Sequence, residues 1–125
     1  MKKNKKLLLI FISQNVILIY KSKRYSDCLF FCHLGLECLL KALIVKITNK
    51  PSPYAHDLER LAELAKLEID AEVKKYLQTI TKFNLESRYP EFKFRFYKSI
   101  DKKYCDKYFN ITKKLILWLK KEINK

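Results

Sequence analysis

The sequence is poor in glycine and proline, the residues that most often form tight turns. Glycine occurs once, at Gly35, and proline three times, at Pro51, Pro53 and Pro90. A sheet protein of 125 residues needs turn residues far more often, so this scarcity favours a few long helices. A single glycine also excludes a glycine-rich phosphate-binding loop.

The chain also lacks the patterns of a metal site and of a disulfide framework. It has two histidines and four cysteines, and no pair of cysteines has the C-x-x-C spacing of zinc sites. Three of the cysteines fall in one expected helix, where residues four apart rarely have the geometry of a disulfide. We therefore expect no metal, no cofactor and free buried thiols, as is typical of a cytoplasmic protein.

Acidic residues are scarce, with 13 against 27 lysines and arginines, and the net charge is +14. Residues 1–25 contain seven basic residues and no acidic one, and residues 71–125 contain fifteen basic and six acidic residues. Such a charge attracts nucleic acid, an anionic membrane or an acidic partner. A general enrichment of surface lysine explains the charge equally well.

The beginning of the chain, "MKKNKKLLLIFISQNVILIY", has a basic start and an apolar run. The run is six residues long, "SQN" interrupts it, and no A-x-A cleavage site follows, which argues against a signal peptide. The whole stretch is too short and too polar to span a bilayer. We expect a buried first helix and no membrane partner, with interfacial membrane binding as a minor alternative.

Apolar spacing predicts an all-α, single-domain, up-and-down bundle of four to five helices over residues 1–125. The expected helices are residues 5–21, 25–47, a short segment after Asp57, a helix after Asp70, and a last helix from near Ser99. Both aspartates are expected N-caps. The last helix has an apolar seam, expected to face the bundle or a second subunit, that contains Tyr104, Tyr108, Ile111, Leu115 and Trp118.

His33, Glu37 and Lys41 recur every four residues and therefore form one strip of the second expected helix. An imidazole and an ammonium on one strip suit a phosphate or a nucleobase. Spacing alone nevertheless favours ordinary helix surface with a Glu–Lys pair. His56 precedes an expected N-cap, where packing on Tyr54 is a more economical interpretation than a general base.

The segment "RYPEFKFRFYKSIDKK" mixes basic and aromatic residues. Cations neutralise phosphates and exposed aromatic rings stack on bases, so the mixture suits single-stranded RNA. In the alternative interpretation, Phe92, Phe94 and Phe96 belong to the core and the basic residues are a solvated face.

Three motifs, "YSDCLFFCHLGLECLLKAL", "PSPYAHDLERLAELA" and "LESRYPEF", follow one another over about residues 23–120. In this order they resemble the small stand-alone HEPN proteins of bacteria and archaea. The resemblance implies a helical bundle that dimerises and often partners a small nucleotidyltransferase in a toxin–antitoxin-like pair. It also implies that some branches are metal-independent ribonucleases, marked by an arginine and a histidine with four to six residues between them.

That ribonuclease signature is absent, because none of the four arginines has a histidine at these separations. The resemblance instead matches Arg88 to an R-Y-P element, either as a cationic handle or as a cap on helix carbonyls. Enzymatic activity therefore remains open, and we expect a non-catalytic subunit that dimerises, partners a nucleotidyltransferase or binds nucleotide or RNA. A ribonuclease toxin with a non-standard site is the alternative. The candidate contact residues are Arg88, Tyr89, His33, Glu37, Lys41, His56, Lys93 and Arg95.

Overall fold

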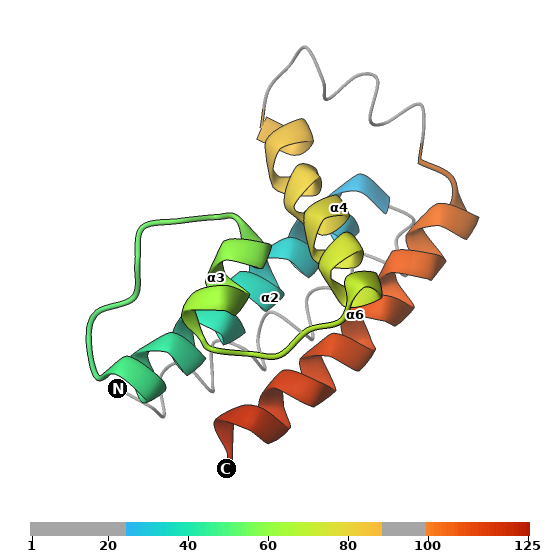
Figure 1. Ribbon diagram of the computed structural model, residues 1–125. Helices are drawn as coiled ribbons and strands as arrows, with labels where there is room; N and C mark the ends of the chain where they lie inside the picture. The colour runs from blue at the N-terminus through green and yellow to red at the C-terminus, as the bar shows by residue number, and fades with distance from the viewer. Residues whose placement is uncertain (1–24, 89–99) are drawn as a thin grey trace.

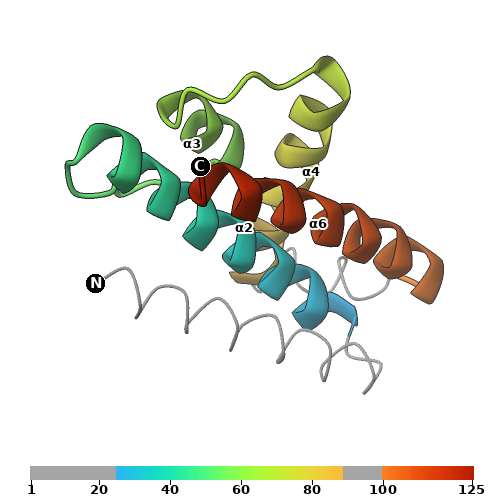
Figure 2. The ribbon, with the colours of Figure 1, turned by 90° about the horizontal axis from the view of Figure 1, so that it is seen from below.

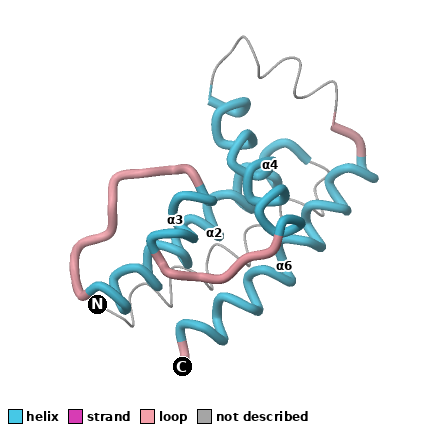
Figure 3. The backbone as a smooth tube through the Cα atoms, in the orientation of Figure 1, coloured by secondary structure: helices cyan, strands magenta, loops and turns pink. Residues whose placement is uncertain are grey.

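The described part of the chain folds into α-helices connected by loops (Figure 1). The computed structural model describes residues 25–88 and 100–125, and the helices within them are α2 (Tyr25–Thr48), α3 (Leu58–Leu64), α4 (Ala71–Arg88) and α6 (Lys102–Ile123). No strand occurs in these two ranges (Figure 3). The all-α bundle expected from the sequence is confirmed, while the expected first helix, residues 5–21, lies outside the described residues.

Helix α2 lies at the centre of the fold and packs against α3, α4 and α6. Figure 2 shows α2 and α6 side by side, with α3 and α4 together above them. Among the described residues, one stretch, Cys28–Thr48 of α2, is long and apolar enough to cross a membrane, and most of it is buried inside the protein. Its apolar composition is accounted for by a core position, since three other helices cover it.

Helices α2 and α6 run in the same direction. Near their starts, the thiol of Cys28 in α2 interacts with the thiol of Cys105 in α6. Near their ends, Lys46 Nζ of α2 donates to the carbonyl of Lys125 at 2.7 Å and also to the carbonyl of Ile123. The lysine thereby satisfies carbonyls that the end of α6 leaves without helical partners.

Aspartate side chains begin the last three helices, as the sequence predicted for Asp57 and Asp70. Asp57 accepts from the amides of Glu59 and Arg60, and Asp70 accepts from the amide of Val73 at 2.8 Å. Helix α6 begins at Lys102, because Asp101 caps it by accepting from the amide of Tyr104 at 2.8 Å. Each cap satisfies amides that the first turn leaves unpaired.

Two helices are followed by a residue other than glycine in the left-handed backbone conformation. Asn49 follows α2 with a φ of 55°, and Lys66 follows α3 with a φ of 58°. Asparagine accepts this left-handed backbone readily, but lysine does so less often. Hydrogen bonds that close the end of α3 hold Lys66 in place, from its own amide to Glu63 and from Leu67 to the Ala62 carbonyl.

The buried face of α6 has five residues, like the expected seam, but at every second position the buried residue is the one that follows the expected residue. The buried residues are Cys105, Tyr108, Thr112, Leu115 and Leu119. Tyr108 and Leu115 were predicted correctly, but Tyr104, Ile111 and Trp118 are only partly buried at the edge of the core. Cys105 and Thr112 are small residues in the middle of this face, and the larger side chains of Tyr104, Ile111 and Trp118 lie at its sides.

Thr112 provides a test of the core. Its hydroxyl is buried and has no hydrogen-bond partner among the described residues. We expect Thr112→Val to raise the free energy of unfolding by about 1 kcal/mol, because the buried hydroxyl is replaced by a methyl group of similar size. Urea unfolding measures the change. Thr48→Val is the control and should not stabilise, since the Thr48 hydroxyl donates to the Ile44 carbonyl at 2.7 Å.

All four cysteines are free, and only Cys38 is partly exposed. The hydrogen bond to Cys28, together with burial, raises the pKa of Cys105. The same bond lowers the pKa of Cys28, but a hydrogen bond with Cys32 and burial outweigh it, so the pKa of Cys28 is also raised. Both thiols are therefore held in the protonated form inside the core.

The raised pKa values of Cys28 and Cys105 predict that the protein loses stability in alkaline solution. Because their folded pKa exceeds the unfolded value, their contribution is complete below about pH 8.5 and is lost as the pH rises further. Urea unfolding at pH 7 and pH 10 should show a smaller alkaline loss for the double variant Cys28→Ala, Cys105→Ala than for the wild type. Cys38→Ala is the control, and an equal loss in all three proteins would contradict the prediction.

Candidate functional site

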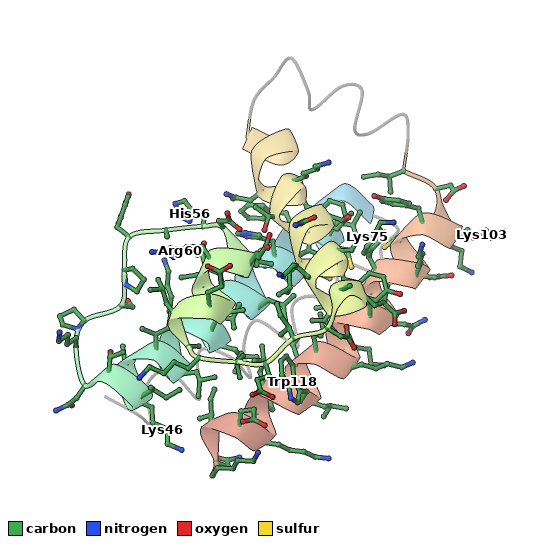
Figure 4. The ribbon with its side chains drawn as sticks, in the orientation of Figure 1. Lys46, His56, Arg60, Lys75, Lys103 and Trp118 are labelled. Carbon is green, nitrogen blue, oxygen red and sulfur yellow. The ribbon has the colours of Figure 1, made fainter. Side chains whose placement is uncertain are left out.

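A polar cluster lies where α2 meets the loop before α3. His33, Glu37 and Lys41 come from successive turns of α2, and His56 comes from the last residues of the loop. We call these four residues the His–Glu cluster. Figure 4 shows His56 beside the start of α3.

His33 holds the loop against α2. Its side chain is buried, with 1% of the residue exposed. Its Nε2 lies 2.9 Å from the carbonyl oxygen of His56, and because a carbonyl only accepts, the imidazole Nε2–H is the donor. His33 is thus bound to the backbone of His56 and fixes the loop.

Glu37 links the remaining two members of the cluster. One carboxylate oxygen, Oε1, accepts from Nδ1 of His56 at 2.5 Å. The other, Oε2, lies 3.8 Å from Nζ of Lys41. Glu37 is 7% exposed, so this carboxylate has little contact with water, and its two partners replace part of its hydration.

The imidazole of His56 is both oriented and accessible. Its bond to Glu37 uses Nδ1–H, which leaves Nε2 as the second polar atom of the ring. The side chain is 38% exposed, and the ring of Tyr54 packs edge-on against it with centroids 5.9 Å apart. Tyr54 itself is 98% exposed. An aromatic face and an imidazole edge are therefore presented together to solvent.

The neighbouring helix fixes this loop from its other end. The amide of Leu58 donates to the hydroxyl of Thr81 in α4 at 3.1 Å, in addition to the Asp57 cap. Arg60 projects on the same side of α3 as His56 in Figure 4, and its guanidinium is paired with Glu63 at 3.4 Å. These hydrogen bonds hold the end of the loop against α3 and α4.

This arrangement has two chemical capabilities. The first is binding, because Tyr54 can stack on a base while Lys41 and His56 contact an anion or a hydroxyl. The second is proton transfer, because a carboxylate that holds Nδ1–H of an imidazole leaves Nε2 to accept a proton. Within residues 25–88 and 100–125, no group of three or more histidine, cysteine or acidic side chains is placed to hold a metal ion.

Four of the eight residues predicted from the sequence lie in the cluster. The interpretation of His33 and Glu37 as ordinary helix surface is wrong, since both are buried. Arg88 is the last residue of α4, and its side chain is not among the described ones. Tyr89, Lys93 and Arg95 lie outside the described residues, so their contact roles stay predictions.

Tyr54 was not among the predicted site residues. Its position between two prolines and His56, in "PSPYAH", is the available signal, because a proline-rich loop exposes its side chains.

A comparison with known families finds a match, and it covers most of the chain. The family model described as HEPN domain matches residues 14–123. No curated protein and no solved structure was found to match the chain. The matched range contains every helix described above and all four residues of the His–Glu cluster. The chain therefore belongs to the HEPN domain family.

Proposed function

We propose that this protein is a non-catalytic HEPN subunit that binds a nucleotide or RNA through the His–Glu cluster and Tyr54. It acts as a homodimer in the cytoplasm and partners a small nucleotidyltransferase in a toxin–antitoxin-like system. The observation that carries the proposal is the exposed Tyr54 ring against the oriented imidazole of His56, with Lys41 on the same carboxylate.

Each part of that group has a role in binding. The solvent-exposed face of Tyr54 is free of the core and offers a stacking surface for a base, an interaction that tolerates any base type. Lys41 and the accessible edge of His56 supply the polar contacts to phosphate or ribose. Glu37 and His33 do not need to touch the ligand, because they hold the ring and the loop in place.

Titration of a nucleoside triphosphate tests this site. We expect Tyr54→Ala and Lys41→Gln each to weaken binding about tenfold, equivalent to about 1.4 kcal/mol. Lys75→Gln is the matched control, because it removes one exposed lysine charge from α4 (Figure 4), and it should change the affinity less than twofold. Equal binding by the wild type and both site variants would refute the assignment.

The dimer and the partner need separate measurements. Solution mass at tens of micromolar should be that of two chains, and a monomer would contradict the dimer. Co-expression with the product of an adjacent nucleotidyltransferase reading frame should yield a complex that survives purification. Failure to form a complex would remove the partner from the proposal and leave nucleotide binding unaffected.

One observation favours the alternative, a ribonuclease with a non-standard site. The contact of 2.5 Å between Glu37 Oε1 and His56 Nδ1 is the arrangement of a carboxylate that orients a general base. His56 Nε2 would take the proton of a ribose 2′-hydroxyl, and the 2′-oxygen would attack the adjacent phosphorus. The bond from phosphorus to the 5′-oxygen would break, and that oxygen would take a proton from water.

A further inference from the structure

Helix α6 carries a row of lysines on the face turned away from the other helices. Lys103, Lys107, Lys114 and Lys121 follow one another at intervals of four, seven and seven residues, which keeps them on one side of the helix. All four are exposed, and we call them the α6 lysine stripe. Figure 4 shows Lys103 at the outer end of this helix, pointing into solvent.

No fully exposed acidic residue lies beside the stripe on α6. The exposed residues of α6 are six lysines, Asn110 and Leu117, and none is acidic. The two acidic residues of α6, Asp106 and Glu122, are only partly exposed, and Glu122 is paired with Lys125 at 2.9 Å. From Lys103 to Lys121 the stripe is about 27 Å long, since a helix rises about 1.5 Å per residue. It is therefore a straight line of positive charge that is long enough to contact a macromolecule.

We propose that the α6 lysine stripe is a sequence-independent binding surface for the phosphate backbone of RNA. The inference rests on the proposed function for the nature of the polymer, and it adds a second surface to the His–Glu cluster. A line of ammonium groups suits a chain of phosphates, and each contact between an ammonium group and a phosphate releases counterions.

Two features of this face argue against membrane binding and against recognition of a base sequence. A helix that lies in a membrane surface needs a wide apolar face, whereas the only large apolar side chain exposed on α6 is Leu117, at 61%. The partly buried rings of Tyr104 and Phe109 belong to the edge of the core. Because the stripe itself contains no aromatic residue that could stack on a base, it contacts charge and not sequence.

The stripe can be tested against an equal change of charge elsewhere. The stripe variant is Lys107→Gln, Lys114→Gln, Lys121→Gln, and the matched control is Lys74→Gln, Lys75→Gln, Lys82→Gln on the exposed face of α4. Both lose three positive charges, and glutamine keeps the helix propensity of lysine. A third variant with arginine at the three stripe positions keeps the charge and should bind like the wild type.

The measurement is fluorescence anisotropy with labelled oligouridine and oligoadenosine over a range of salt concentrations. We expect the stripe variant to bind both oligomers about tenfold more weakly, with a salt slope smaller by about 2, or roughly 0.7 for each of three phosphates. The α4 control should change by less than about twofold. Equal weakening in the α4 control, no weakening in the stripe variant, or a clear preference for one oligomer would overturn the inference.

Two further arms separate this inference from its alternatives. The wild type should bind vesicles of phosphatidylcholine with phosphatidylserine no better than it binds RNA. The proposal would be refuted if the stripe variant lost vesicle binding without any loss of RNA binding. The double variant Tyr54→Ala, Lys41→Gln should lose nucleoside triphosphate binding while the stripe variant keeps it. Retained nucleotide binding by that double variant would refute the assignment of nucleotide binding to the His–Glu cluster and would leave the assignment of the stripe unaffected.

Discussion

Phe83→Ala is expected to lower the free energy of unfolding by about 3–5 kcal/mol, the range for removing a large buried aromatic side chain. Phe83 is fully buried on α4 and contacts α6 through two rings. The centroids of Tyr108 and Tyr104 lie 5.3 Å and 6.1 Å from its own, both edge-to-face. Loss of the ring removes this contact between α4 and α6 and leaves a cavity beside α2.

Urea unfolding followed by circular dichroism measures the effect of Phe83→Ala. Tyr54→Ala is a suitable control, because it removes an aromatic ring of similar size from an exposed position and should change stability by less than about 0.5 kcal/mol. A loss below about 1 kcal/mol for Phe83→Ala would show that these rings are not part of the core.

His33→Leu has the second largest expected effect, a loss of about 1–3 kcal/mol in the free energy of unfolding. Leucine keeps most of the volume but cannot donate to the His56 carbonyl, which is left without this partner. The loop before α3 should then loosen, and His56 should lose its fixed distance to Glu37. Nucleotide affinity is therefore expected to fall about tenfold although His33 itself is buried.

The conservative variant His33→Gln distinguishes positioning from packing, since its side-chain amide can donate to the same carbonyl. We expect His33→Gln to recover part of both the stability and the nucleotide affinity. The imidazole resonances of His56, followed by NMR, should move in His33→Leu and remain near the wild-type positions in His33→Gln. Unchanged His56 resonances in both variants would mean that His33 only fills space.

Much of the fold could be predicted from local patterns. Asp57 and Asp70 were identified as N-caps because an aspartate before an apolar repeat satisfies the free amides of the first turn. The start of α6 was placed near Ser99, two residues before its N-cap Asp101. The buried face of α6 was less predictable, because Cys105 and Thr112 are small and do not stand out as core residues.

The candidate site could be predicted only in part. The strip of His33, Glu37 and Lys41 follows from helical spacing, but spacing does not reveal whether a polar strip is covered. The deciding contact is made by His56, which lies 19 residues from Glu37 in the sequence and reaches it only because the loop folds back on α2. Tyr54 was missed for the same reason, since its ring gains a role only beside His56.

The most direct test of the proposed role is incubation of end-labelled RNA with the wild type, His56→Ala and Arg88→Ala, scored on one gel series for retardation and for cleavage. A non-catalytic binding subunit should leave the RNA intact in all three samples, and retardation should be weaker with His56→Ala than with the wild type. Cleavage by the wild type that disappears in His56→Ala would contradict this role and establish Glu37 and His56 as the site of a ribonuclease.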